Sequence, residues 1–306
     1  MKQKLLLIIL ILMALLFGWH MSSFWQNRII KYEDQKFIIE SGEYGYDLLN
    51  PDSDITLPDY LIEISGLSLY NDDEIVCVED ERGVIYFLNV DLKTIVRQEK
   101  FGAPGDYEGV EVLADTAYVA KSNGTIEYFK VNNKSGIGPV REIDTDLKSR
   151  NNLEGLGYLP SQKLLLLACK NKGDTKKFDT DHKSIFAVKT VSKAFLDQPA
   201  ITIDMSQLNE KLIHNGLSGE IHLPFNPSGV AVHPFDGKIF IISYSAKLLI
   251  VMDEHSYIFQ TIPLDPKLFE QPEGICFGNN GTLYIANEGK SGSGYILEFK
   301  NFLNSN

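Results

Sequence analysis

The stretch QPEGICFGNNGTLYIANEGKSGSGYILEF, residues 271–299, decides the fold of this chain. It opens with Glu273-Gly274 and continues into three short apolar segments separated by polar turns. The first turn contains Asn280-Gly281, two residues that tolerate the positive φ required by two-residue hairpins. Three short antiparallel strands form most of one sheet, but such a sheet cannot bury both of its faces alone. The sequence therefore predicts that this unit packs against copies of itself.

The same opening, a serine or glutamate followed by glycine and an apolar residue, recurs along the chain. The five openings are Ser65-Gly66, Glu108-Gly109, Glu154-Gly155, Ser228-Gly229 and Glu273-Gly274. Their glycines are separated by steps of 43, 46, 74 and 45 residues. Three of these steps match the length of a propeller blade, about 40 to 50 residues. The long step predicts either an insertion or a degenerate extra blade.

Two further apolar segments follow each opening. The predicted second strands are 74–78, 116–120, 164–169, 239–243 and 283–286, and the predicted third strands are 84–90, 126–131, 185–188, 248–252 and 295–299. We therefore expect an all-β, five-bladed β-propeller over residues 51–306, with six blades as the alternative. An N-terminal strand at 36–40 or 54–57 is expected to complete the last blade. Residues 204–222 are the best candidate for a short helix, with Leu208, Leu212 and Ile213 on one side.

The N-terminus differs from the rest of the chain. Lys2 and Lys4 precede an uninterrupted apolar run from Leu5 to Phe17, which matches the apolar region of a secretory signal. No A-x-A-like cleavage site follows, and the segment up to Trp25 is about 31 Å long as a helix, enough to cross a bilayer. We therefore predict a single-pass signal-anchor at 1–25, a tether at 26–50 and an extracytoplasmic (periplasmic) propeller. A cleaved signal and a secreted protein are the alternative.

Composition narrows the classes of partner. The formal net charge of −12 argues against nucleic acid and anionic lipid surfaces as direct partners, since both attract basic proteins. The three cysteines, Cys77, Cys169 and Cys276, lie within three different apolar strands. An odd count without paired spacing does not indicate a disulfide framework, so we expect buried, unpaired thiols.

The region from about 58 to 300 resembles the SdiA-regulated family of bacterial envelope proteins. The likeness is carried by ISGLS (64–68), GDYEGVEV (105–112), NNLEGLGY (151–158), PSGVAVHPFDGKIFIISYSAKLLIVMD (227–253) and QPEGICFGNNGTLYIANEG (271–289). The resemblance implies an N-terminal membrane segment and a five-bladed propeller that binds calcium and is distantly similar to NHL-repeat propellers. It implies no reaction. The long third blade, with its extended 190–226 segment, departs from the pattern.

The openings are also the candidate site. First strands line the channel of a propeller, so Glu108, Glu154 and Glu273 are expected to converge there, with Ser65 and Ser228 completing the ring. Clustered carboxylates repel one another unless a cation neutralises them. Calcium suits such a site because it binds oxygen ligands in flexible geometry. Glu288 is a weaker candidate ligand, and Asn171 and Asn287 are weaker still.

Other interpretations of these glutamates remain open. Each could cap the turn at the start of its strand, with the glycine allowing close backbone approach, or face a substrate without any metal. A calcium-dependent hydrolase of a lactone or ester would need a base to activate water. His233 and His255 are the residues to consider, although His233 lies in a His-Pro turn. No catalytic motif supports nucleophilic or zinc chemistry.

The segment KNKGDTKKFDTDHK, residues 170–183, alternates basic and acidic residues. It could grip an anionic ligand near the channel mouth, or it could be a solvated connection. The leading functional hypothesis is a membrane-anchored propeller of the cell envelope that binds calcium. Such a propeller would act as a ligand-binding or scaffold module for an unidentified small molecule or protein.

Overall fold

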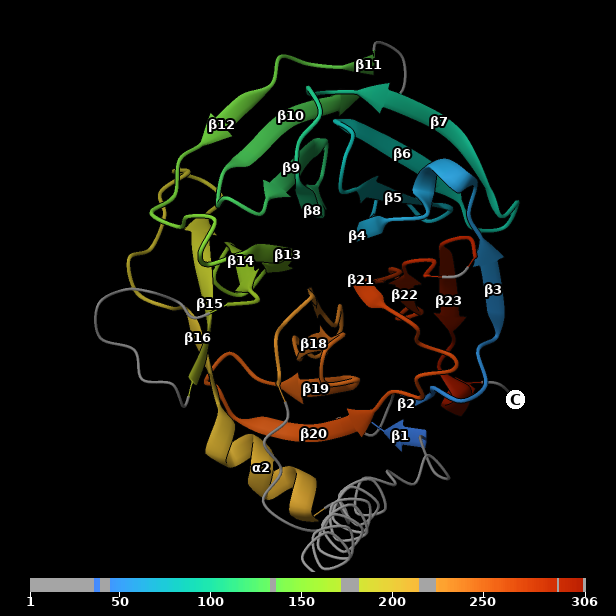
Figure 1. Cartoon of the computed structure of the whole chain (residues 1–306), viewed down its shortest axis with the longest axis vertical. Helices are drawn as coiled ribbons and strands as arrows, with labels where there is room; N and C mark the ends of the chain where they lie inside the picture. Colours follow the sequence, from blue (N-terminus) through green and yellow to red (C-terminus); the bar gives the residue numbers. More distant parts are fainter. Residues whose placement is uncertain are drawn as a thin grey trace, which may run out of the picture.

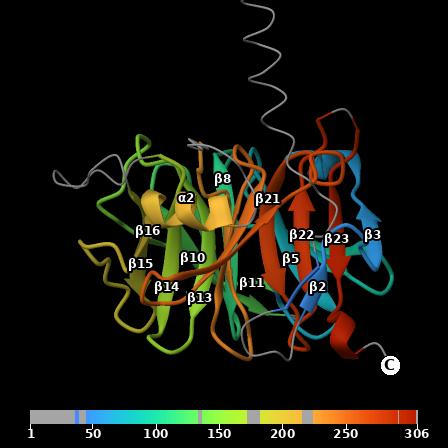
Figure 2. The same ribbon diagram turned by 90° about the horizontal axis from the view of Figure 1, so that it is seen from below.

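The computed structural model describes residues 36–38, 45–132, 136–171, 182–214, 224–290 and 292–304. Within these ranges five antiparallel sheets are arranged around a central axis (Figure 1). Seen side-on, the strands of each sheet run roughly along that axis (Figure 2). The prediction of an all-β, five-bladed propeller is confirmed.

Each blade is numbered from its innermost strand outward. Blade 1 contains β4 (Ile64–Leu69), β5 (Glu74–Glu79), β6 (Val84–Asn89) and β7 (Thr94–Lys100). Blade 2 contains β8 (Tyr107–Leu113), β9 (Thr116–Lys121) and β10 (Ile126–Asn132), whose outer edge pairs with β11 (Gly136–Ile137) and β12 (Arg141–Ile143). Blade 3 contains β13 (Leu153–Leu159), β14 (Leu164–Cys169), β15 (His182–Lys189) and β16 (Ile201–Asp204). Blade 4 contains β17 (Gly229–Val232), β18 (Ile239–Ser243), β19 (Leu248–Met252) and β20 (Ile258–Pro263). Blade 5 contains β21 (Pro272–Phe277), β22 (Leu283–Asn287), β23 (Tyr295–Phe299) and β3 (Ser53–Thr56).

The position of a strand in its blade decides its pattern of burial. Second strands have neighbouring sheets on both faces, so β14 (LLLLAC) is buried at every position. The outermost strand β7 (TIVRQEK) instead alternates between exposed and half-buried residues. Five clusters of buried apolar side chains, one in each gap between adjacent blades, form the core. The interior therefore lies between the repeated units, as the sequence predicts.

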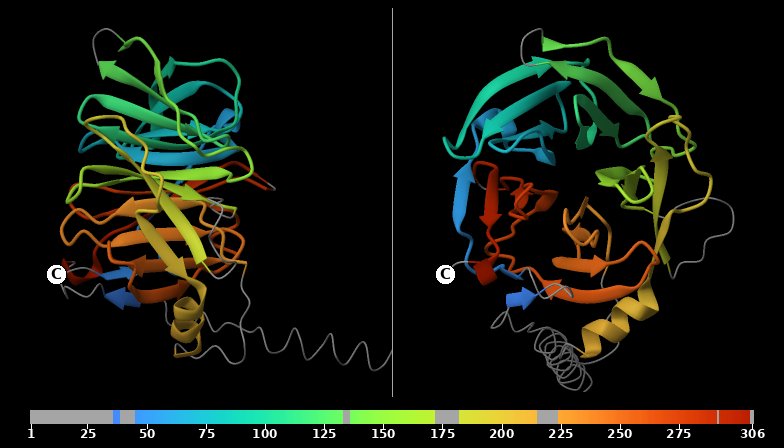
Figure 3. Two further views of the ribbon diagram at one scale, coloured as in Figure 1. Left: turned by 90° about the vertical axis from the view of Figure 1, so that its left-hand side faces the viewer. Right: turned by 180° about the vertical axis from the view of Figure 1, so that it is seen from behind.

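The ring is closed by a strand from the N-terminal side of the chain. β3 pairs antiparallel with β23, placing Thr56 opposite Tyr295 and Ser53 opposite Glu298. From behind (Figure 3), β3 lies in blue along the outer edge of the red blade 5. The predicted closure of blade 5 by an N-terminal strand at 54–57 is confirmed, with the strand at 53–56.

The step of 74 residues contains an insertion rather than a sixth blade. After β16 the chain forms α2 (Met205–His214), which packs beside β20 on the outside of blade 4 (Figure 1). Asp204 begins the helix, since its Oδ1 accepts the backbone N–H of Ser206 at 2.8 Å. Of the three apolar residues predicted to share one side, Leu208 and Leu212 are fully buried and Ile213 is 49% exposed. Residues 215–222 of the predicted helix lie outside the described residues.

The N-terminal part of the described chain contacts blades 4 and 5. β1 (Lys36–Ile38) pairs antiparallel with β2 (Gly45–Asp47). Tyr46 and Leu48 are fully buried in the cluster between blades 4 and 5, and the Tyr46 hydroxyl donates to the carbonyl of Gly281 at 2.5 Å. Residues 45–50, which the sequence assigns to the tether, therefore pack on the propeller.

The predictions for the membrane segment and the cysteines differ in outcome. The signal-anchor at 1–25 lies outside the described residues. No helix in the described ranges is long and apolar enough to span a bilayer. All three cysteines are buried and unpaired, as expected.

Candidate functional site

The five openings meet around the axis, at one end of the channel. Strands alternate in direction within a blade, so second strands end and third strands begin at this end. We call it the carboxylate face, defined by Glu108, Glu154 and Glu273. The opposite face carries the turns between first and second strands.

The glycines of the openings bring neighbouring first strands into backbone contact. A Cβ on Gly66 would stand 2.8 Å from Cα of Gly109, and one on Gly155 would stand 3.0 Å from Cα of Gly229. At Gly229 it would lie 2.4 Å from the carbonyl oxygen of Glu273. Any side chain at these positions would push the blades apart. Glycine is thus required by the narrow bore, as the close-approach interpretation proposed.

In four of the five blades the residue before the glycine stands in a β-bulge. In blades 1, 2 and 3 the pairing between first and second strands skips Ser65, Glu108 and Glu154, and in blade 5 it skips Glu273-Gly274. A bulge adds one residue that has no partner on the adjacent strand, which turns its side chain away from the regular alternation. In this way an ordinary strand start presents a polar side chain at the channel mouth.

The two serines fasten adjacent blades. The Ser65 hydroxyl donates to the carbonyl of Tyr107 in blade 2 at 2.7 Å, and the Ser228 hydroxyl donates to the carbonyl of Pro272 in blade 5 at 2.7 Å. Both side chains are almost fully buried. Ser65 lines the small cavity at the glycine ring, and both serines use their hydroxyl protons in hydrogen bonds between blades.

The three ring glutamates share a single electrostatic environment. Glu154 and Glu273 are 3% and 6% exposed, and Glu108 is half-buried. Burial, followed by repulsion from Glu154 and Asp106, raises the pKa of Glu108 to about 9. Burial and repulsion from Glu154 raise the pKa of Glu273 to about 8. The carboxylates are therefore close enough to oppose one another's ionisation, as the sequence predicts.

Lys170 partly neutralises this cluster. It directly follows β14, and its Nζ lies 3.2 Å from both carboxylate oxygens of Glu154, which also accepts a hydrogen bond from the Asn152 amide. Burial still raises the pKa of Glu154, although Lys170 works in the opposite direction. Burial alone would lower the pKa of Lys170, but Glu154, Glu273 and Glu108 together raise it.

Further carboxylates enlarge the cluster toward blades 5 and 1. Glu288 and Asp80 occupy the same place after the second strand as Lys170 does in blade 3. Burial and neighbouring carboxylates, including Glu63 for both, raise the pKa of each to about 7. One oxygen of Asp80 is buried without a hydrogen-bond partner in the described part of the chain.

The sequence reasoning missed Lys170 as a counterion, and it missed Asp80 and Asp106. Counting one residue beyond the predicted second strand of blade 3 would have found Lys170. Asp80 would have needed the observed end of its strand, since the predicted strand stops one residue early. Asp106 precedes its opening by two residues, and no repeated pattern marks it.

One further carboxyl, which is half-buried, lies on the innermost strand of blade 2. Glu111 lies on β8, three residues beyond Glu108, and burial raises its pKa to about 8 while the hydroxyl of Ser68 counteracts this. The equivalent residue in blade 5 is Cys276. The sequence analysis assigned Glu111 no role, because it falls inside an otherwise apolar strand.

The bore at the glycine ring is very small. A cavity of about 10 Å³ is lined by the five glycines together with Ser65, Glu108 and Glu273. Such a space holds about one water molecule. An ion or a water fits there, whereas an organic ligand would have to lie above it on the carboxylate face.

The remaining candidates lie elsewhere or are weak. His233 and His255 follow β17 and β19, so both lie at the opposite face, and His233 is buried against Asp236 with 2.8 Å between Nδ1 and Oδ1. Neither histidine therefore lies at the carboxylate face, and His233 lies in a turn, as the His-Pro pattern indicates. Asn287 is fully buried, with its Oδ1 unpaired among the described residues. The segment 170–183 lies outside them except for Lys170, Asn171, His182 and Lys183.

Solved structures with the same fold include enzymes. A luciferin-regenerating enzyme is 10% identical, with a TM-score of 0.50 over 83% of this chain and 96% of that one. The glutaminyl cyclase of Myxococcus xanthus is 12% identical, with a TM-score of 0.53 over 82% and 95%. At such identities the likeness shows the fold alone. Among curated proteins no relative matches.

The sequence of this chain matches one known protein family. The pattern of one protein family, described as SdiA-regulated, matches residues 54–290, which span all five openings and most of the propeller. The chain belongs to the SdiA-regulated family.

Proposed function

We propose that the protein is a calcium-binding propeller whose carboxylate face binds a ligand or scaffolds a partner in the cell envelope. The observation that supports this most directly is the clustering of Glu108, Glu154, Glu273 and Glu288 beside a cavity with room for a single small atom. Carboxylates whose ionisation is suppressed by one another gain free energy when a cation neutralises them.

The donor chemistry fits calcium. All four side chains offer hard oxygen ligands, and backbone carbonyls and water can supply others. In their present rotamers, no three His, Cys, Asp or Glu side chains of the described ranges converge to hold one metal ion. Glu154 is also engaged by Lys170. After side-chain rotation the ion would be held by Glu108, Glu154, Glu273 and Glu288. Glu154 would then exchange the ammonium of Lys170 for the ion.

Titration calorimetry with calcium tests this proposal. We expect the full chain to bind one ion and the triple variant Glu108→Gln/Glu154→Gln/Glu273→Gln to lose at least a hundredfold in affinity. A matched control, Glu142→Gln/Asp197→Asn/Glu210→Gln, removes three exposed carboxylates away from the channel and should bind as the parent does. No heat from the parent chain, or equal loss in both variants, would reject a channel site.

A calcium-dependent hydrolase of a lactone or ester is the second candidate. It would need a base at the mouth. In this second candidate Glu108, Glu154 and Glu273 would hold the ion, and Glu288, whose pKa is raised to about 7, would stay free to act as the base. Chelator-sensitive hydrolysis of a lactone panel, lost in Glu288→Gln and Glu154→Gln, would support it. Turnover that persists with chelator would exclude this mechanism.

Membrane anchoring forms the third part of the proposal. Its support is the apolar run at 5–17 and its extension to Trp25. We expect the chain to stay with membranes through carbonate extraction, with the propeller open to protease only from the extracytoplasmic side. A released chain lacking its first residues would instead establish the cleaved signal.

A further inference from the structure

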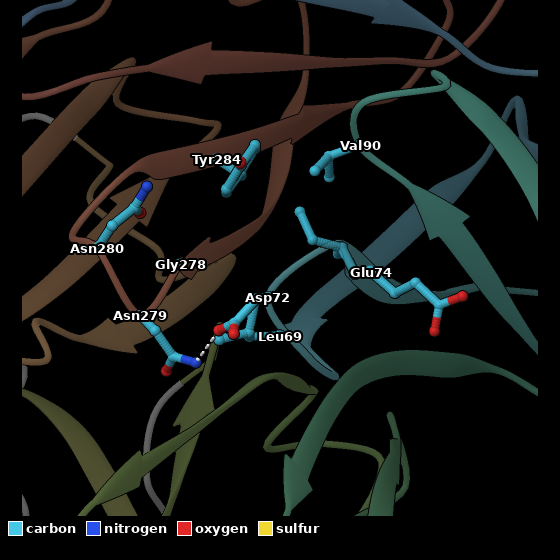
Figure 4. Close-up of a pocket in the computed structure, with 9 residues that line it drawn as sticks. Leu69, Asp72, Glu74, Val90, Gly278, Asn279, Asn280 and Tyr284 are labelled. Carbon is cyan, nitrogen blue, oxygen red and sulfur yellow. Dashed lines mark hydrogen bonds between the residues drawn. The ribbon is translucent and has the colours of Figure 1, made fainter. Parts of the chain in front are cut away.

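The cavity of about 330 Å³ between blades 5 and 1 lies at the opposite face and brings no charged groups together. Asn279 donates to Asp72 at 2.7 Å, whereas the carboxylate of Glu74 points away from both (Figure 4). Charged groups converge instead at the carboxylate face, where blade 4 meets blade 5. The charge there is positive, opposite to that of the ring.

Two lysines lie beside one tyrosine between these blades. Tyr244 and Lys247 belong to the turn between β18 and β19, and Lys290 follows β22. Nζ of Lys247 lies 4.1 Å from the centre of the Tyr244 ring. Nζ of Lys290 lies 4.8 Å from the same centre and donates a hydrogen bond to the Tyr244 hydroxyl. The two ammonium groups therefore share one aromatic side chain, although they come from different blades.

Neither ammonium group forms an ion pair with a carboxylate among the described residues. Lys247 is half-buried, and its Nζ donates to the backbone carbonyl of Glu270 at 2.5 Å. The chain has 41 acidic residues and 29 basic ones, so a shortage of carboxylates does not explain the arrangement. The positive charge of the two lysines is left for another group to neutralise.

The electrostatic environment of Lys247 disfavours its charge. Burial, followed by repulsion from Lys290, lowers the pKa of Lys247 to about 8, although Glu273 and Glu270 act in the opposite direction. Lys290 is exposed, and its hydrogen bond to Tyr244 raises its pKa, so it stays charged. An anion in contact with both lysines would relieve their repulsion and favour the charged form of Lys247.

The hydrogen-bond donors of the pair suit an oxyanion. Each ammonium group carries three N–H donors. Among the described residues Lys247 uses one of them on Glu270, and Lys290 uses one on Tyr244, so two remain on each. A carboxylate or phosphate offers at least two oxygens, which can accept charge-assisted hydrogen bonds from both lysines.

We propose that Lys247, Lys290 and Tyr244 form a binding site for the carboxylate or phosphate group of a ligand. The two ammonium groups bind the oxyanion, and the ring of Tyr244 holds Lys247 in place beside Lys290. Lys247 is close enough to Glu273 for their charges to affect one another, so a ligand held here extends toward the channel mouth. The site does not depend on calcium at the ring.

An NMR titration of the ¹⁵N-labelled full chain in non-ionic detergent micelles tests the site. The probes are inorganic phosphate and acetate, with chloride at matched ionic strength as the control. At pH 7 we expect phosphate, acetate or both to shift the amide signals of Lys247 and Lys290 in a saturable way, and the tighter of the two identifies the preferred group. No saturable shift with either, or equal shifts with chloride, would overturn the inference.

Two variants and a matched control locate the interaction. Lys247→Gln/Lys290→Gln should weaken oxyanion binding at least tenfold. Lys163→Gln/Lys189→Gln removes two exposed lysines from the opposite end of blade 3, makes the same change in net charge and should bind as the parent does. Lys290→Gln alone changes only an exposed side chain and should still weaken binding at least threefold, which keeps the test valid if the double variant folds poorly. Equal loss in the control would reject the site.

The channel triple variant Glu108→Gln/Glu154→Gln/Glu273→Gln separates this inference from the calcium proposal. It should bind the oxyanion at least as tightly as the parent does, because it removes negative charge close to Lys247. Loss of oxyanion binding in this variant would show that the ring holds the anion, and it would reject an independent lysine site.

Discussion

Lys170 brings a positive charge into contact with Glu154, so any cation at the carboxylate face must compete with it. Lys170→Met keeps the aliphatic stem and removes the ammonium. Two unit charges 4 Å apart interact by about 4 kcal/mol at an effective dielectric constant of 20. If removal of the ammonium returns about a third of that free energy to calcium binding, the affinity for calcium rises about tenfold. We therefore expect roughly tenfold tighter calcium binding by calorimetry, together with a lower melting temperature in chelator.

The control for this prediction is Lys189→Met, which removes an exposed lysine from the other end of blade 3. It should leave calcium affinity and melting temperature unchanged. Weaker calcium binding by Lys170→Met would mean that Lys170 positions Glu154 instead of competing for it.

The raised carboxyl pKa values predict how stability depends on pH. Glu108 and Glu273 have pKa values of about 9 and about 8, whereas 4.5 is the ordinary value. Between these limits the folded state binds more protons than the unfolded state, so the free energy of unfolding falls as pH rises. Without calcium, we expect a loss of roughly 2 kcal/mol from pH 5 to pH 9, less than ideal linkage because water reaches the mouth.

Urea denaturation at pH 5, 7 and 9 measures this dependence. Glu108→Gln should flatten it, and so should saturating calcium, because both remove the proton-dependent repulsion. A stability that rises toward pH 9 in the parent chain would contradict the raised pKa values.

At the residue scale, the sequence predicted much of the site. Five repeated dipeptides were enough to place Glu108, Glu154 and Glu273 at one mouth, since equivalent positions of a propeller converge on its axis. It could not predict Lys170 as their partner, because pairing depends on which side chains reach across blades. The direction of β17 sends the His-Pro turn to the opposite face, so His233 is a turn residue there.

At the scale of elements, the inner strands depend on glycine for their close approach. Gly229→Ala would place a methyl group 2.4 Å from the Glu273 carbonyl oxygen, and the two backbones cannot both stay in place. Forced overpacking of this kind typically costs about 1–3 kcal/mol, with the upper end expected where the obstacle is backbone. We expect a correspondingly lower urea midpoint.

Gly292→Ala is the control for this prediction, because a Cβ there meets nothing within 4 Å. It should change the midpoint by less than about 0.5 kcal/mol. If Gly229→Ala also left the urea midpoint unchanged, the backbone contact between the inner strands would be less rigid than the ring requires.

Most strands could be predicted because each repeat contains the same pattern of apolar segments separated by polar turns. The second strand of blade 3 and the second and third strands of blade 4 were placed to the residue, since their apolar runs begin and end at polar turns. The helix was harder. Its apolar positions do not say which neighbour it packs against, and Ile213 remains exposed because α2 meets the groove between blades 3 and 4 along Leu208 and Leu212.

At the scale of the whole molecule, closure joins residues far apart in sequence. Ile55 on β3 pairs with Ile296 on β23, and both are buried in the cluster between blades 5 and 1. Either residue changed to alanine should cost about 2–5 kcal/mol, and the double variant should cost less than the sum because the two share one cavity.

Unfolding of Ile55→Ala should remain a single transition, coincident by far-UV and near-UV circular dichroism. Each blade buries its faces only against its neighbours, so opening at the seam removes support from the whole ring. Separate transitions by the two probes would show that blade 5 opens independently of the others.

The number of blades could be predicted from sequence only up to the 74-residue step. Length alone did not separate an insertion from a degenerate blade. The 74-residue step contains an insertion because β16 and α2 bury their apolar residues within blades 3 and 4, so no additional sheet is needed.

The β-bulge at the start of the first strands has a consequence for how this protein can change. Its extra residue makes no strand pairing, so the identity of that residue is largely uncoupled from the stability of the sheet. Serine and glutamate already occupy equivalent bulges in this one chain. The glutamate positions of the mouth can therefore change without disturbing strand pairing, so mutation and selection can vary charge and binding preference there, whereas Ser65 is also held by its hydrogen bond to the next blade.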